Sequence, residues 1–185
     1  MNFLKLSVTF VKSLSALFIP GKCPKRIDNE KIVAGESLAS DSTPSDIIRY
    51  LKAQQPHYDL SRFLDAQEVA YTQALSELKG GRKQSHWIWS IFPQQKGLGH
   101  SYNSKYYGLD GEGEARAYIE HEILGDRLRE CCKALLLHKD KDIKYIMGSG
   151  IDVLKLKTSM RLFNKVSPDD VFKEVLDAFF LNHSE

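Results

Sequence analysis

The sequence predicts an all-α fold, a single compact domain of several helices with one irregular loop rich in aromatic residues and glycine, preceded by an N-terminal extension. Three observations support this prediction. From residue 58 onward the apolar residues recur at the three- and four-residue spacing of amphipathic helices. There is no run of β-branched residues that indicates a strand and no internal repeat. The 185 residues suffice for one ordinary domain rather than two.

The composition is that of a globular protein that is soluble in water, with 42% hydrophobic and 27% charged residues. A net charge of +2 is too small to indicate nucleic-acid binding by itself. The adjacent cysteines Cys131 and Cys132 fall in a helical pattern, where neighbouring side chains point about 100° apart. That geometry suits neither a disulfide nor a shared metal site. We interpret Cys23, Cys131 and Cys132 as reduced, packed residues, which favours an intracellular location.

Residues 1–27 are predicted to be a targeting or amphipathic segment. Its first 19 residues contain Lys5 and Lys12, no acidic residue, and a wide apolar face on a helical wheel. Three interpretations remain open: a mitochondrial or other organellar transit peptide, a signal or anchor that contacts a membrane surface, and an extension with neither role. The two lysines argue against a transmembrane span. The expected partner is a membrane or the import machinery, and without targeting the expected location is cytoplasmic.

Residues 28–57 have the composition of a linker, because Pro44 and Pro56 accompany a polar run at 35–46. A short helix is expected at Asp46–Gln55, capped by Ser45. The helical domain is therefore assigned to residues 58–182.

The first helix of the domain is expected to begin at Asp59 or Ser61 and to end at Gly80–Gly81, either continuous or broken near Asp65. The next segment, 85–92, predicts either a helix or a short strand.

The strand alternative arises because Trp87, Trp89 and Ile91 alternate with other residues; Pro93 ends either element. Residues 94–108 are predicted to be a loop with a helical turn at 104–107. Later helices are expected at Gly113–Glu120, Ile123–His138, Asp142–Met147 and Ile151–Phe163, followed by one that begins at 167–170 with Pro168 in its first turn.

The most informative segment is 82–107, which holds both tryptophans and lies in a stretch with no Asp or Glu between Glu77 and Asp110. Basic and aromatic side chains are mixed along it. This combination suits an anionic ligand with a flat ring, or equally a packed core with a basic rim.

Several side chains of this segment are candidates for a site. His86 is the candidate for proton transfer, unless it is a core histidine bonded to the backbone. Trp87 and Trp89 are candidates for ring stacking. In a helix they point about 200° apart and cannot face one ligand, so one of them is expected in the core. Gln94 and Ser101 flank a glycine-rich loop whose N–H groups suit a phosphate or carbonyl group.

Three cations, Lys83, Arg127 and Lys155, are candidates to bind an anion, although each alone is more often a surface residue. Ser159 is added to the ligand-binding candidates. No metal site is expected, since the histidine spacing lacks nearby carboxylates, and no pattern indicates a cofactor. If the protein is an enzyme, the candidate general bases are Asp65, Glu68 and Asp152.

Three motifs carry a family resemblance: Lys83-x-Ser85-His86-Trp87-x-Trp89, Phe92-Pro93-Gln94 and Gly97-Leu98-Gly99-x-Ser101. They resemble the signature of a small all-α family of domains of unknown function whose members are often named calpastatin. The resemblance covers about residues 58–180 and implies an all-helical fold without an established activity.

The chain departs from the pattern of that family at two positions. Arg161 stands where the family usually has Thr, and Thr158 where it usually has Ser. A long cation at Arg161 would change the ligand if this position contacts it.

Two hypotheses of function follow. In the first, the protein binds or acts on a small anionic, nucleotide-like or phosphorylated ligand in a pocket built around residues 85–101. In the second, it is a non-enzymatic helical module that interacts with a protein or with single-stranded RNA. The motifs do not decide whether the protein is an enzyme.

Overall fold

The computed structural model describes residues 43–45 and 56–181 of the chain. The segment predicted at 1–27, the short helix predicted at 46–55, and Cys23 lie outside the described residues. Within the described residues the regular structure is helical, apart from one isolated bridge between Gln95 and Leu109. The predicted all-α fold is confirmed. No helix of the described part is both long and apolar enough to cross a membrane.

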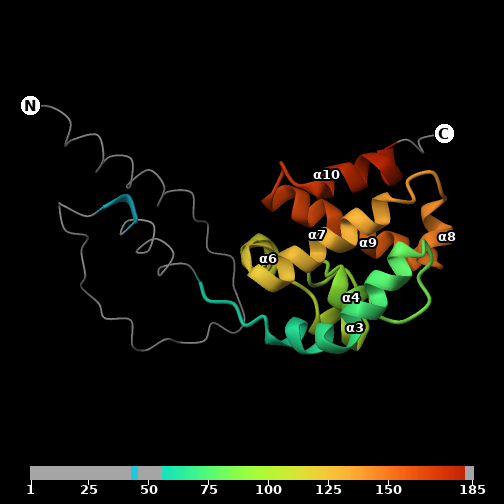
Figure 1. Ribbon diagram of the computed structural model, residues 1–185. Helices are drawn as coiled ribbons and strands as arrows, with labels where there is room; N and C mark the ends of the chain where they lie inside the picture. Colours follow the sequence, from blue (N-terminus) through green and yellow to red (C-terminus); the bar gives the residue numbers. More distant parts are fainter. Residues whose placement is uncertain (1–42, 46–55, 182–185) are drawn as a thin grey trace, which may run out of the picture. The chain divides into compact units, whose positions relative to one another are not determined.

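Helix α3 (Ser61–Lys79) is the first helix of the domain, and it packs most extensively against α7 (Glu122–Leu136) (Figure 1). It runs without a break at Asp65. Asp59 provides a hydrogen-bond acceptor for the first turn of α3, because the Asp59 Oδ1 accepts from the Ser61 backbone N–H at 2.9 Å. The alternative of a broken helix was therefore wrong.

Helix α4 (Ile88–Ile91) is only one turn long, and the expected element at 85–92 is correspondingly shorter than predicted. Its first part is held outside the helix by Glu77, whose carboxylate accepts bonds from the backbone N–H groups of Gln84 and Ser85 at 2.7 and 3.1 Å. N–H groups bonded in this way are not available to a strand ladder, and the helix begins only at Ile88. Trp87 consequently becomes the residue that precedes the helix.

Helix α5 (Tyr102–Tyr106) starts two residues before the predicted turn, because the Ser101 side chain caps it by accepting from the Ser104 N–H. Helix α6 (Gly111–Glu120) likewise begins earlier than expected. Helix α8 (Ile143–Met147) lies inside the predicted range; Asp142 caps its start, and Gly148, with φ of 77°, ends it.

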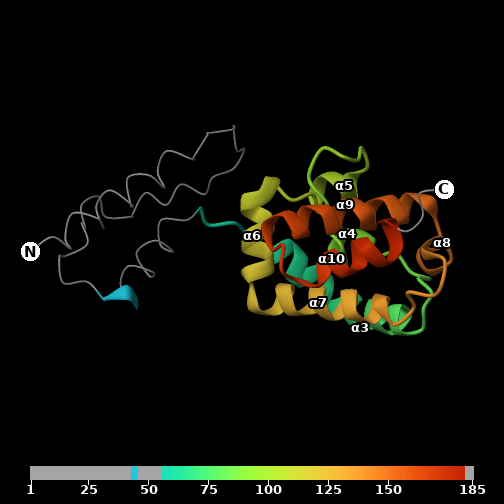
Figure 2. The same ribbon diagram turned by 90° about the horizontal axis from the view of Figure 1, so that it is seen from above.

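Helix α9 (Gly150–Val166) packs against α10 (Val171–Leu176), which continues into the π-helical turn η2 (Asp177–Leu181) (Figure 2). The last helix begins at the end of the predicted segment 167–170, so Pro168 does not lie in its first turn. Asp170 caps α10 instead, accepting from the Val171 N–H at 2.8 Å, and Arg129 of α7 bonds its carboxylate at 2.8 Å. A cap held by another helix decides where α10 begins.

The core joins the helices through a row of rings. Phe63 lies 5.0 Å from Tyr118 between ring centres, Tyr118 lies 5.5 Å from Phe163, and Phe163 lies 5.5 Å from Phe172. Cys131 and Cys132 are buried in this core as free thiols. Burial raises the pKa of Cys131 to about 12 and that of Cys132 well above its usual value, so both stay protonated. They pack as small apolar side chains, in agreement with the interpretation from the sequence.

The loop between α4 and α6 is tied into a closed shape by its two ends. Lys96 donates its backbone N–H to the Leu109 carbonyl at 2.8 Å, and Leu109 donates to the Gln94 carbonyl at 3.0 Å. Figure 2 shows α5, which this loop carries, beside α9. The same loop, α4 and α9 together line the candidate site.

Candidate functional site

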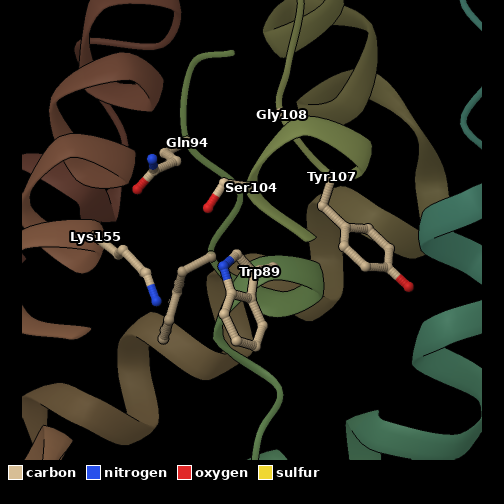
Figure 3. Close-up of a pocket in the computed structure, with 7 residues that line it drawn as sticks. Trp89, Gln94, Ser104, Tyr107, Gly108 and Lys155 are labelled. Atoms are coloured by element: carbon tan, nitrogen blue, oxygen red, sulfur yellow. The ribbon is translucent and has the colours of Figure 1, made fainter. Parts of the chain in front are cut away.

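A small pocket lies between α4, the loop and α9. Its free space is about 190 Å³, part of it open to solvent, and the lining side chains leave almost no room for a water molecule between them. The lining residues are Trp89, Phe92, Gln94, Ser104, Tyr107, Gly108 and Lys155. Figure 3 shows the Ser104 hydroxyl pointing into the space between Gln94, Lys155 and Trp89, while the Tyr107 hydroxyl points away.

The central contact of the pocket joins Lys155 and Trp89. The Lys155 ammonium lies 4.3 Å from the centre of the Trp89 ring, within the range of a cation–π interaction. The Trp89 indole Nε1 is buried and has no hydrogen-bond partner among the described residues. A buried donor without a partner costs about 1–3 kcal/mol. The pocket therefore presents a free N–H donor beside a positive charge.

Asp152 holds Lys155 in place and links it to Lys83. Its two carboxylate oxygens lie 2.7 Å from the Lys83 Nζ and 3.1 Å from the Lys155 Nζ. Burial alone would raise the pKa of Asp152, but the hydrogen bonds and charges of the two lysines outweigh it and hold the pKa below the usual range. One carboxylate between two ammonium groups leaves the cluster with a net positive charge. A carboxylate held ionised in this way is a weak base, which argues against Asp152 as the general base.

The loop side of the pocket depends on two glycines. Gly97 has φ of 93°, a conformation that other residues rarely adopt. At Gly108 an added Cβ would lie 2.8 Å from both the Lys96 Cα and the Ser104 carbonyl oxygen. The backbone segments at these residues therefore approach Gly108 closely only because it has no side chain. Ser104 is fixed by its hydroxyl contact with Ser101 at 2.8 Å.

Trp87 has a structural role on the other side of α4. It is 2% exposed, and its Nε1 donates to a Glu77 oxygen at 2.8 Å. Burial would raise the pKa of Glu77, but its hydrogen bonds from Gln84, Ser85, Gln73 and Trp87 prevail and lower the pKa to about 2. The two tryptophans thus face different surroundings, one the core and the other the pocket.

Among the candidates from the sequence, the structure brings Trp89, Gln94 and Lys155 together in the pocket. Lys83 joins them indirectly through Asp152. Ser159 is buried one turn after Lys155, and its hydroxyl has no partner among the described residues. The pocket does not include His86, which is exposed.

Ser101 is an exposed cap outside the lining, although it contacts Ser104. Arg127 lies elsewhere, with its guanidinium 4.7 Å from the centre of the Tyr71 ring. Asp65 and Glu68 are exposed on α3 and do not line the pocket. Arg161 does not line this pocket either.

Sequence reasoning missed Ser104 and Gly108 as lining residues. Ser104 follows the cap Ser101 by three residues, and this Ser-x-x-Ser spacing places both hydroxyls on one side of the first turn. Thr158 lies close to the pocket. Its hydroxyl is 3.5 Å from the Gln94 Oε1 and bonds the Leu154 and Lys155 carbonyls at 3.0 Å.

Comparison with known proteins identifies the family. Residues 57–185 match the model of the family described as "Protein of unknown function (DUF1810)". The chain belongs to this family. No curated protein matches the sequence. The crystal structure of the conserved hypothetical protein Rv1873 from Mycobacterium tuberculosis is similar, with 39% identity, a TM-score of 0.64, and coverage of 66% of this chain and 88% of that chain. The family match over residues 57–185 includes all the residues that line the pocket.

Proposed function

We propose that the protein binds a small anionic ligand, a phosphorylated or nucleotide-like molecule, through an anionic group seated between Trp89 and Lys155. The observation that carries the proposal is the buried Trp89 Nε1 without a partner beside the Lys155 ammonium. An anionic oxygen would accept from both groups at once, and such charge-assisted bonds are among the strongest. The Ser104 hydroxyl and the Gln94 amide are further partners in the same lining.

The size of the pocket restricts how such a ligand binds. With Lys155 over the indole ring the lining leaves almost no room for a water molecule, whereas sites for whole drug-sized ligands measure roughly 300–1,000 Å³, so the pocket admits at most one small charged group. A nucleotide would therefore place one charged group in the pocket and extend over the surrounding surface. Since the lining is closed even to water, entry requires Lys155 to move off the indole ring. Its long side chain rotates easily, and Asp152 remains as its anchor.

The test uses the two tryptophans of the chain as reporters. The full chain is labelled with 5-fluorotryptophan, and its ¹⁹F NMR spectrum is followed while phosphate, AMP, ADP-ribose or a sugar phosphate is added. We expect the Trp89 signal, assigned by its loss in Trp89→Phe, to shift while the Trp87 signal stays in place. Lys155→Met should abolish the shift.

Lys165→Met is the matched control, because Lys165 is an exposed lysine of the same helix, and its only described ion pair is with the half-exposed Glu112. This variant should retain the response. A Trp89 signal that stays unmoved by every compound at millimolar concentration would contradict the proposal, as would an equal shift in Lys155→Met.

A second candidate, a platform for single-stranded RNA, is favoured by a pair of exposed rings on α5. Tyr102 and Tyr106 are stacked, with ring centres 5.7 Å apart and planes 10° from parallel, and they are 77% and 46% exposed. Bases stack on such rings when cations are nearby, and Lys105 lies on the same helix. Binding of a labelled oligoribonucleotide that is lost in Tyr102→Ala but kept in Trp89→Phe would select this function over the pocket.

A further inference from the structure

A second hollow, distinct from the pocket at Trp89, lies between α9 and the α10–η2 arm, two elements that pack side by side (Figure 2). Its free space is about 570 Å³, part of it open to solvent. About 260 Å³ of it has room for water-sized molecules, somewhat less than the roughly 300–1,000 Å³ of small-molecule sites, so the groove suits a small ligand. We call it the α9–α10 groove, and its lining residues are Lys157, Arg161, Asn164, Lys173, Leu176, Asp177, Phe180 and Leu181.

The charge of the groove is unbalanced. Lys157 and Arg161 are four residues apart on α9 and so lie on one face, where like charges repel. Lys173 is neutralised by Asp177 at 2.5 Å. Among the described residues, neither Lys157 nor Arg161 forms an ion pair with a carboxylate. Within the described part of the chain, two positive charges on one wall of the groove therefore lack a counter-charge.

Asn164 extends the same wall by one more turn. Its Oδ1 is buried and has no hydrogen-bond partner within the described residues. Because a side-chain amide can present either its oxygen or its NH₂ group after a rotation, Asn164 is able to donate to an anion held by Arg161. The α9 wall is thus a row of three side chains that can donate hydrogen bonds.

The opposite wall carries three apolar side chains beside the Lys173–Asp177 ion pair. Leu176 ends α10, and Phe180 and Leu181 belong to the π-helical turn η2, a form of helix that is often found at functional sites. Leu181 is 63% exposed, and the Lys157 ammonium lies 5.5 Å from the centre of the Phe180 ring. A ligand that matched this wall would cover apolar surface that water now contacts.

We infer that the α9–α10 groove binds a carboxylate joined to an apolar body, the chemistry shared by medium-chain fatty acids and N-acylated apolar amino acids. The carboxylate pairs with the planar guanidinium of Arg161, which can hold both oxygens, and with Lys157. The apolar body covers Leu176, Phe180 and Leu181. A fully polar anion would match one wall only.

The test is a titration of the ¹⁵N-labelled full chain, followed by NMR, with octanoate and with N-acetyl-leucine. Acetate supplies the charge without the apolar body, and octanamide supplies the body without the charge. We expect octanoate or N-acetyl-leucine to shift amide signals of α9 and η2, with acetate and octanamide at least about tenfold weaker. Whichever of the two acids binds more tightly identifies the source of the carboxylate.

Arg161→Gln should weaken binding of the preferred acid by about tenfold or more. Lys165→Gln, which removes one charge from the same helix outside the groove, should leave binding unchanged. Leu181→Ser, at an exposed position that is compatible with folding, should weaken the binding of octanoate but not that of acetate. Trp89→Phe should have no effect, which separates this site from the proposed function. Equal binding of octanoate and octanamide, or undiminished binding in Arg161→Gln, would overturn the inference.

Discussion

Lys155 covers Trp89: its ammonium lies 4.3 Å from the centre of the indole ring and 3.1 Å from the nearer oxygen of Asp152. The lysine therefore occupies the space in which a ligand would meet the indole N–H. Because Asp152 also bonds Lys83 at 2.7 Å, the same carboxylate connects the start of α9 with the segment before α4. The candidate pocket and the contact between these two segments thus depend on the same carboxylate, that of Asp152.

Asp152→Asn is expected to destabilise the protein. The Lys83 side chain is only 7% exposed, and the change leaves its charge without a carboxylate. Removing one partner of a buried ion pair costs roughly 3–5 kcal/mol, and partial exposure of the cluster reduces our expectation to about 2–3 kcal/mol. Urea denaturation at pH 7 measures the effect. Asp126→Asn, at a carboxylate whose side chain is 80% exposed, is the control and should change stability little. Similar stability of the two variants would contradict the role given to Asp152.

Glu77 is expected to make stability depend on pH in the acid range. Its pKa is lowered from 4.5 to about 2 in the folded protein, so the folded state favours the ionised form. The stabilising contribution is present above the unfolded value and is lost as pH falls from about 4.5 to about 2. A shift of this size corresponds to roughly 3 kcal/mol.

Denaturation curves for the parent and Glu77→Gln measure this dependence. At pH 7 the variant should be less stable, and the difference should shrink steadily below pH 4.5 as the parent carboxylate becomes protonated. A difference that is the same at pH 7 and in acid would show that the lost contacts, rather than the charge of Glu77, determine the effect.

Gly108→Ala is expected to disturb the loop that lines the pocket. The added methyl group would lie 2.8 Å from the Lys96 Cα and from the Ser104 carbonyl oxygen, both of them backbone atoms that cannot simply rotate away. Overpacking of this kind costs about 1–3 kcal/mol. Gly150→Ala is the matched control, since nothing lies within 4 Å of the added Cβ there. Thermal denaturation of both variants should lower the melting temperature of the first only; an unchanged melting temperature in Gly108→Ala would show that the loop ends can separate.

Much of the fold followed from periodicity. The stripe of apolar residues in α7 and the Asp and Gly that bound α8 are local signals, and the structure places those helices close to their predicted bounds. The boundaries that were mispredicted depend on distant partners. Glu77 keeps 84–87 outside α4, and Arg129 fixes Asp170 as the cap of α10. A contact between segments far apart in the chain does not change the spacing of apolar residues in either segment, so periodicity cannot predict it.

For the site, the sequence by itself determined the composition of the segment: an acid-free, aromatic stretch, glycines that permit a tight loop, and two tryptophans of which one was expected in the core. It also led to Trp89, Gln94 and Lys155. Only the tertiary structure decided that Lys155 lies over Trp89, that Lys83 and Lys155 share Asp152, that His86 is exposed away from the pocket, and that Arg161 lines a different groove. Spacing along the chain specifies which face of a helix a residue occupies, whereas the packing between helices specifies what that face meets.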